Sequence, residues 1–314
     1  MAAAISDITS VAKINDYRSN SLWRLTLRRI FRQRSAVAGM TILGTLILTA
    51  IFAPLIAPYD PLDVLIGDED VKKRAAPCIY LLGCPKDQPQ HIMGIDGNVR
   101  DLFSRVIYGT RASLTVGFGA VSFAIIVGTL LGAVSGFFGG WVDNIIMRIL
   151  DVLLAFPALL LAITIVSVLG RGLQYALLAI AIVSIPIYAR VVRASVLSVK
   201  EAEFVAASRA LGASSFHILG RRILPNAIPP LIVQGTLGVA TAILDAAALS
   251  FLGLGAQPPM AEWGTMLGTE RNQIFTAPHL VFFPGIAIMI TVLAFNLLGD
   301  GMRDAIDPRL HQPS

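Results

Sequence analysis

Asp245 is the side chain with the clearest capacity for chemistry, because it is an acid near the middle of an apolar stretch, TAILDAAALSFLGLG. A carboxylate at the centre of a membrane-spanning helix costs about 2.5 to 3.5 kcal/mol to insert, whereas each leucine or isoleucine returns only about 0.3 to 0.6 kcal/mol. The span can still insert, but the acid must face protein or water. Asp245 is therefore a candidate for a translocation route, and the alternative is a carboxylate that is hydrogen-bonded between helices.

Four other polar side chains lie in or beside apolar stretches. Arg148 and Asp151 stand three residues apart in MRILDVLL, a spacing that allows a structural ion pair on one helix face. Asn296 and Asp300, near the end of the last apolar stretch, either contact the route or satisfy neighbouring backbone groups. The sequence leaves these two possibilities open.

Recognisable catalytic constellations are lacking. The four histidines are scattered without metal-ligand spacing. There is no G-x-x-x-x-G-K-[ST] phosphate loop and no G-x-S-x-G elbow, and no lysine follows a glycine. We therefore predict no catalytic residue, metal site or cofactor in this chain. The chain also lacks a recognisable nucleophile and base, which an intramembrane enzyme would need.

The composition indicates that the segments carrying these residues lie in a lipid membrane. Of 314 residues, 55% are hydrophobic and 14% charged, with a mean hydropathy of +0.72, whereas soluble domains carry about a quarter charged residues. The net charge of +5 fits the concentration of Lys and Arg in cytoplasmic segments better than a nucleic-acid partner. We interpret the first apolar run as a retained signal anchor.

Apolar stretches of about 20 residues can cross a hydrocarbon core of about 30 Å as helices. Such stretches cover residues 36–53, 113–136, 145–169, 173–196, 231–255 and 280–298. We therefore predict an all-α, polytopic membrane protein of about six transmembrane helices. Its parts would be a cytoplasmic segment 1–35, a first transmembrane helix 36–56, an extracytoplasmic loop 57–111, a transmembrane core 112–300 with an inner loop 198–226, and a cytoplasmic tail 301–314.

Cations set the predicted orientation. A cluster precedes the first span: Lys13, Arg18, Arg24, Arg28, Arg29, Arg32 and Arg34. The positive-inside rule then places both termini in the cytoplasm, and the cations around the inner loop agree. The loop 57–111 falls outside, although it also carries cations.

Three local patterns carry structural expectations. Cys78 and Cys84 could pair if their segment faces an oxidising compartment, and two cysteines alone make no zinc site. Pro157 and Pro186 should kink their helices. Small residues recur every four positions and should form a smooth ridge for close helix packing: Ala120, Ala124, Gly128, Gly132, Gly136 and Gly140.

The inner segment from Glu203 to Asn226 is predicted to form two short helices around a turn. On the first, Phe204, Ala207, Ser208 and Leu211 share a face. Gly212 suits a left-handed helix end, and Ser214 can cap the second helix, which Pro225 would end. On the second, Phe216, Leu219 and Ile223 share a face while His217, Arg221 and Arg222 point elsewhere.

Such an element suits docking in a protein groove, because short apolar anchors with flanking cations match helix-in-groove recognition. The alternative is an amphipathic loop on the bilayer surface.

The run AASRALGASSFHILGRRILPN is similar to the cytoplasmic EAA loop of ABC-importer permeases. The chain matches that pattern with Ala207, Gly212, Leu224 and Pro225. It departs where Ala206 replaces the usual glutamate, where Ser208 replaces the second alanine, and where the isoleucine is displaced by one to Ile223. The missing glutamate leaves the helix-turn-helix shape intact.

Further blocks along the chain resemble the dipeptide/oligopeptide permease C-type subunit. They are FAPLIAPYDP, HIMGIDGNVRDLFSRVIYGTRASL, GGWVDNIIMRILDVLLAFPALLLA, SFLGLGAQPPMAEWGTML and AFNLLGDGMRDAIDPRL. The resemblance implies a fold like that of type I ABC importer permeases, in a bacterial inner or plasma membrane. Several independent blocks in the right order make it far more specific than one motif.

The resemblance also implies partners and roles. They would be a homologous second permease, two cytoplasmic ATPase subunits that bind ATP and Mg, and an extracytoplasmic substrate-binding protein. The inner loop would supply the coupling helix that sits in the ATPase cleft, and Asp245 would help to receive a peptide ammonium. Trp263 is expected as an interfacial anchor in an outer loop.

The leading hypothesis is thus a non-enzymatic permease subunit of an ATP-driven importer for dipeptides or oligopeptides. A permease of the same family for nickel chelates or another small solute is an alternative. A proton-coupled carrier that uses Asp245 and Asp151 is a rival from another class, but such carriers are commonly built from internal repeats and need no inner docking helix.

Overall fold

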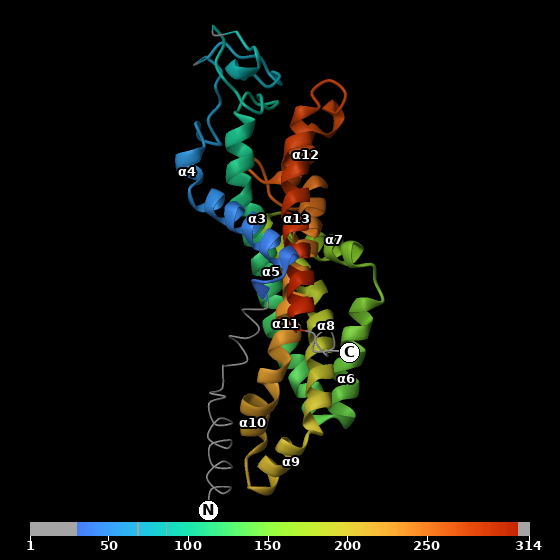
Figure 1. Ribbon diagram of the computed structural model, residues 1–314. Coiled ribbons are helices and arrows are strands. Elements are labelled where there is room, and N and C mark those ends of the chain that lie inside the picture. Colours follow the sequence, from blue (N-terminus) through green and yellow to red (C-terminus); the bar gives the residue numbers. More distant parts are fainter. Residues whose placement is uncertain (1–29, 68, 86, 307–314) are drawn as a thin grey trace, which may run out of the picture.

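Long helices standing side by side form an elongated bundle, with short helices and loops at its two ends (Figure 1). The computed structural model describes residues 30–67, 69–85 and 87–306. The longer helices are α3 (Arg34–Ile51), α5 (Leu102–Phe138), α6 (Gly140–Leu154), α7 (Ala158–Leu169), α8 (Leu173–Lys200), α9 (Glu203–Ala210), α11 (Leu224–Phe251), α12 (Trp263–Glu270) and α13 (His279–Ile306). The short elements are α4 (Ala53–Ile56), α10 (Ser215–Ile218), two 3-10 turns (Tyr80–Leu82 and Arg271–Gln273) and a π-helical turn (Leu219–Ile223). Most of the N-terminal cation cluster, from Lys13 to Arg29, and residues 307–314 of the predicted tail lie outside the described residues.

The prediction of an all-α protein with about six membrane helices is confirmed. Within the described residues, five helices are long and apolar enough to cross a membrane, and the bent pair α6–α7 raises the number to six if it is one span. The third predicted span, 145–169, is therefore not one straight helix. Its two parts meet at an angle of 91°, and Pro157 lies at the break, where its ring cannot continue α6. Pro186, by contrast, lies inside the unbroken helix α8.

Helix α5 begins before the predicted second span. Asp101 caps it by accepting a hydrogen bond from the backbone N–H of Ser104 at 2.7 Å, so the helix starts at Leu102. Residues 102–111, which we assigned to a loop, are consequently helical. With 37 residues, α5 is long enough to extend beyond the hydrocarbon core.

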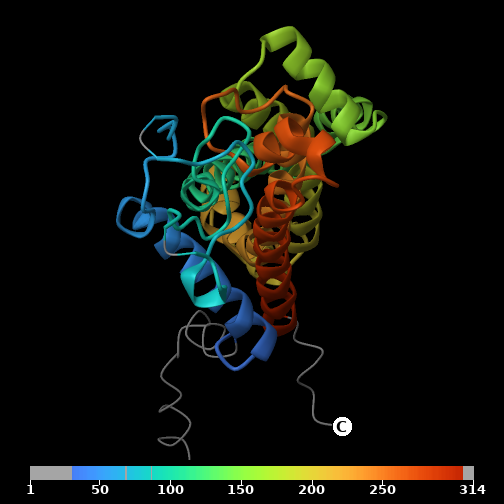
Figure 2. The ribbon, with the colours of Figure 1, turned by 90° about the horizontal axis from the view of Figure 1, so that it is seen from above.

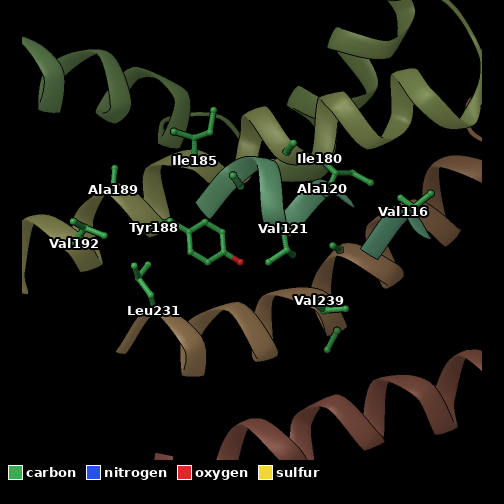
Figure 3. Close-up of a cluster of buried hydrophobic side chains, with 14 of the residues drawn as sticks. Val116, Ala120, Val121, Ile180, Ile185, Tyr188, Ala189, Val192, Leu231 and Val239 are labelled. Atoms are coloured by element: carbon green, nitrogen blue, oxygen red, sulfur yellow. The ribbon is translucent and has the colours of Figure 1, made fainter. Parts of the chain in front are cut away.

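The small-residue ridge of α5 packs against α8, as the four-residue spacing predicted. A Cβ atom at Gly128 would lie 2.8 Å from the Cβ of Tyr188, and one at Gly132 would overlap the carbonyl oxygen of Ala189. Gly140 does not belong to the ridge, because it starts α6 and nothing lies within 4 Å of an added Cβ there. Figure 3 shows the apolar core around Tyr188.

Helices α11 and α13 complete the bundle, and α3 packs along α13, where Gly39 allows the two backbones to approach closely. Viewed from above, α3 and the α6–α7 pair lie on opposite sides (Figure 2). Helices α9 and α10 form one end of the bundle, called here the α9–α10 end. Residues 57–101 and α12 form the opposite end, called the loop end (Figure 1).

Candidate functional site

The α9–α10 segment has the predicted helix-turn-helix shape. Helix α9 ends at Ala210, and Gly212 adopts a left-handed conformation with φ of +80°. Ser214 then caps α10, its hydroxyl oxygen accepting from the backbone N–H of His217 at 3.4 Å. The glycine turn and the serine cap therefore lie where the sequence placed them.

The prediction that Pro225 ends the second helix is wrong. Helix α10 passes through the π-helical turn Leu219–Ile223 directly into α11, and Pro225 lies in the first turn of α11. The missing N–H of Pro225 removes one hydrogen bond from this continuous helix, directly after the π-helical turn. The segment is consequently continuous with a long helix of the bundle.

The predicted shared face of Phe216, Leu219 and Ile223 is also wrong. A π-helical turn contains an extra residue, so the side chains beyond it are rotated relative to those before it. Phe216 is 81% exposed, whereas Ile223 is fully buried. Ile223 joins Val205 and Ile218 in anchoring the segment to the core.

The exposed apolar side chains of this segment lie at its tip. Leu211 is 88% exposed, Phe216 is 81% exposed and Phe204 is 48% exposed. The other predicted loop residues divide into exposed ones (Ala206, Ala207, Gly212, Ser214, His217, Arg221 and Pro225) and half-buried ones (Ser208, Leu219 and Leu224). Exposed apolar groups beside the exposed cation Arg221 fit a surface that another protein covers.

The three candidate route residues are not brought into one cluster. Asp245 is half-buried on α11, and its carboxylate makes no hydrogen bond or ion pair within the part of the chain that the structure describes. Asn296 and Asp300 are exposed one turn apart on α13. The alternative of an Asp245 carboxylate hydrogen-bonded between helices of this chain is therefore not observed.

Two ion pairs join α6 to α8, and one of them corrects a prediction. Asp151 pairs with Arg190 of α8 at 2.6 Å rather than with Arg148 on its own helix. Asp143 accepts two hydrogen bonds from Arg193, each at 2.6 Å. These arginines lie 39 and 50 residues from their partners, so no local spacing could indicate the contacts.

Cys78 and Cys84 are joined by a disulfide at the loop end, with Cα atoms 5.3 Å apart. The small loop that they close carries Leu81, whose side chain is 97% exposed.

A buried histidine links three parts of the loop end. The Nδ1 atom of His91 lies 2.8 Å from Asp101, the cap of α5, and its Nε2 atom lies 3.0 Å from Glu69. Tyr59 donates a hydrogen bond to Glu69 at 2.9 Å, and burial together with this bond raises the pKa of Tyr59 to about 12. The sequence does not indicate this cluster, because single histidines and acids at these spacings form no motif.

The pKa of His91 lies above its ordinary value. Burial by itself lowers the pKa of His91, but the hydrogen bonds and charges of Asp101 and Glu69 outweigh that effect. Because the pKa of His91 is raised in the folded state, its protonated form stabilises the folded loop. This stabilisation is complete below the unfolded-state pKa of about 6.5 and is lost as the pH rises through the higher folded-state pKa.

We therefore expect hydrogen exchange of residues 57–101 to speed up as the pH rises through the folded-state pKa of His91, after correction for the intrinsic pH dependence of exchange. His91→Gln should remove this change and leave exchange in α8 unaltered. A pH dependence that persists in His91→Gln would assign it to another group.

Glu270 ties the loop to α12. Its carboxylate accepts from Arg74 at 3.0 Å and from the backbone N–H of Gly97 at 3.1 Å. Beside it, a cavity of about 40 Å³ is lined partly by Asp96, Arg100 and Arg105, and Arg100 pairs with Asp96 at 2.8 Å. Trp263, predicted to be an interfacial anchor, is instead buried in this region and donates to the carbonyl of Val106 at 3.0 Å.

The fold defines a multi-pass, all-helical membrane protein with a short helical segment at one end of its bundle. Residues 128–312 match the family described as "Binding-protein-dependent transport system inner membrane component". Residues 21–77 match the "N-terminal TM domain of oligopeptide transport permease C". The chain therefore belongs to the binding-protein-dependent permeases of ABC transporters. It is a multi-pass inner-membrane permease subunit and not itself an ATPase.

Individual relatives cover nearly the whole chain. The chain is 46% identical over 301 residues to the dipeptide transport system permease protein DppC of Alkalihalophilus pseudofirmus, covering 94% of this chain and 93% of the relative. It is 42% identical over 303 residues to the glutathione transport system permease protein GsiD of Pectobacterium atrosepticum, covering 96% of each. An inward-facing structure of the MetNI methionine ABC transporter has a similar fold, with a TM-score of 0.53, 21% identity, and coverage of 66% of this chain and 98% of the other.

Proposed function

We propose that this chain forms half of the translocation route of an ATP-driven importer for short peptides. The observation that carries the proposal is the similarity along more than nine-tenths of the chain to permeases named for dipeptide and glutathione transport. Dipeptides and glutathione share an ammonium group, carboxylates and peptide-like amides. A peptide of two to a few residues is accordingly the substrate class.

The proposed complex contains a second, homologous permease, two ATP-binding subunits and a substrate-binding protein. The α9–α10 end would face the cytoplasm and receive the ATPases, which bind ATP and Mg. Two features support this: Leu211 and Phe216 are exposed there, and α10 continues into α11. Closure of the ATPases on ATP would then displace α11, which carries Asp245. The loop end, with its disulfide, would face the oxidising side and the binding protein.

Uptake by the purified complex tests the proposal. The chain is isolated from its native membrane with the subunits that accompany it and is placed in lipid vesicles. We expect accumulation of a labelled dipeptide or glutathione only when ATP is present on the α9–α10 side and the binding protein on the other. Uptake by the chain alone, driven by a proton gradient without ATP, would contradict the proposal and favour the secondary carrier.

Asp245→Asn is expected to lower peptide uptake at least about fivefold while the complex still assembles. Within the described part of this chain the carboxylate has no partner, so its charge remains free to attract an ammonium group, an attraction that is strong where water is scarce. The measurement is initial uptake rate against peptide concentration. Thr45→Ala, at an exposed position of α3, serves as a polar control, and unchanged uptake and peptide preference in Asp245→Asn would remove the proposed role.

A further inference from the structure

Two apolar side chains at the loop end are almost completely exposed. Among the described residues, the most exposed large apolar side chains are those of Leu81, at 97%, and Phe275, at 96%. Single exposed apolar residues are common on protein surfaces and by themselves indicate nothing. These two are different, because each lies on a braced turn and because one segment of the chain holds both turns.

The turn that carries Leu81 is closed by a covalent bond. The disulfide between Cys78 and Cys84 joins its two ends, and the backbone between them includes a 3-10 turn. The hydroxyl of Tyr80 also donates a hydrogen bond to the backbone carbonyl of Gln88 at 2.7 Å. Leu81 is therefore presented by a short loop whose conformation is fixed.

The turn that carries Phe275 is held by Gln273. The backbone carbonyl of Gln273 accepts from the N–H of Ala277 at 2.7 Å, and its side-chain oxygen accepts from the hydroxyl of Thr276 at 2.7 Å. Ala277 itself is buried in the apolar core of the loop end. Phe275 therefore projects from a turn that is anchored in that core.

Residues 91–97 hold the first of these turns. The backbone carbonyl of His91 accepts from the N–H of Cys78 at 2.9 Å, and the backbone N–H of Ile95 donates to the carbonyl of Ala75 at 3.0 Å. These bonds lie at the start of the disulfide loop and just before it. The base of that loop is thus fixed to residues 91–97.

The same segment holds the second turn. The backbone N–H of Gly97 donates to Glu270 at 3.1 Å, and a Cβ atom at Gly94 would lie 2.9 Å from the ring of His279. Glu270 precedes Phe275 by five residues, and His279 follows it by four. Both ends of the turn consequently contact this segment, which fixes the two apolar side chains relative to each other.

The surroundings of both turns are water or protein rather than hydrocarbon. The described part of residues 57–101 has irregular backbone apart from one 3-10 turn, and it exposes charges such as those of Asp60 and Lys72. The turn of Phe275 is not α-helical either, and Arg271 before it is exposed. Irregular backbone and free charges do not face the hydrocarbon of a bilayer.

We propose that Leu81 and Phe275 are the two apolar anchors on which the substrate-binding protein docks. This inference rests on the proposed function, in which the loop end faces that protein. The family to which the chain belongs works with a binding protein, and the opposite end is the one proposed for the ATPases. A second permease would pack along the side of the helices, whereas both turns lie at the end of the bundle (Figure 1).

Two rigid apolar anchors fit a protein partner that offers an apolar pocket to each of them. A few large side chains in such pockets commonly supply most of the binding energy of an interface. Because the turns of Leu81 and Phe275 are already ordered, little conformational freedom is lost when the partner binds. The polar side chains around the two turns would form the rim of the interface.

Photocrosslinking identifies what covers the two anchors. Leu81 or Phe275 is replaced by p-benzoylphenylalanine in the assembled transporter in lipid vesicles, and the binding protein that supports its ATP-driven uptake is added. On illumination, both positions should form an adduct with the binding protein, which mass spectrometry identifies. An adduct with the second permease or with lipid in its place, at either position, would overturn the proposal.

Affinity measures how much each anchor contributes. In lipid nanodiscs, Leu81→Ala and Phe275→Ala should each weaken the binding of the binding protein to the complex at least about tenfold. Ile66→Ala is the matched control, because Ile66 is a 63% exposed apolar residue of the same loop that lies outside both turns. Its truncation should change the affinity less than about threefold, as is usual for residues other than anchors.

Unchanged affinity in Leu81→Ala and Phe275→Ala, or an equal loss in Ile66→Ala, would overturn the proposal. Uptake separates this failure from failure of the proposed function. If uptake requires the binding protein and ATP but neither substitution alters docking, the inference alone fails. If the wild-type complex takes up no peptide in the presence of the binding protein, the proposed function fails, and the crosslinks still identify what covers the two anchors.

Discussion

Phe216→Asp is expected to weaken the association of the permease with its ATPase subunits about thirtyfold or more, without unfolding the bundle. An exposed aromatic side chain at the tip of the proposed docking element is the type of residue that dominates an interface, and its loss commonly costs about 2 kcal/mol or more. An aspartate there would also have to be desolvated in the groove. Because the side chain is 81% exposed in the isolated chain, its replacement removes little internal packing.

The permease is solubilised in detergent and immobilised on a column. The measurement is the permease concentration at which half of the ATPase is retained, compared between wild type and Phe216→Asp. Phe275→Asp is the matched control. Phe275 is 96% exposed but lies near α12, at the loop end. Equal retention of the two variants would show that the ATPases do not bind at the α9–α10 end, and a lowered melting temperature of Phe216→Asp alone would assign its effect to folding.

Gly132→Ala is expected to destabilise the bundle by about 1 to 3 kcal/mol, the usual cost of forcing extra atoms into a packed interior. The new Cβ would overlap the carbonyl oxygen of Ala189, so a backbone segment would have to move. Helices α5 and α8 make the most extensive contact of any helix pair in the described chain. The separation that this methyl group imposes would therefore disturb the core that both helices share.

Thermal unfolding of the purified permease in one detergent measures the effect. Gly285→Ala on α13 is the control, because nothing lies within 4 Å of an added Cβ there and alanine favours a helix more than glycine does. We expect a lower melting temperature for Gly132→Ala and an unchanged or higher one for Gly285→Ala. Equal melting temperatures would contradict the close packing of α5 on α8.

Hydrophobic length and periodicity were sufficient to predict most of the membrane helices. The apolar stretches from residues 173 and 280 became α8 and α13, which start within one residue of the predicted positions and end four and eight residues later than predicted. The ridge on α5 follows from its four-residue spacing. These features depend on residues close together in the sequence. The glycine turn at Gly212 and the cap at Ser214 were predictable for the same reason.

Features that depend on distant contacts were not predictable. Asp151 was assigned to Arg148 on its own helix, but it pairs with Arg190 of the neighbouring helix α8 at 2.6 Å. Trp263 is buried, and its indole N–H donates to the carbonyl of Val106, which lies 157 residues earlier in the chain. The 91° bend of α6–α7 could be located at Pro157, but its size depends on the packing of both parts against α8.

The π-helical turn also explains an error and has a mechanical consequence. It shifted the register between Phe216 and Ile223, which a strict α-helical spacing cannot foresee. Deleting a single residue from Leu219–Ile223 would let the turn rewind as an ordinary α-helix and swivel everything before it by about 100° relative to α11. The proposed docking tip would then point in a different direction relative to α11. The partner subunits would still hydrolyse ATP, but hydrolysis would be uncoupled from peptide uptake.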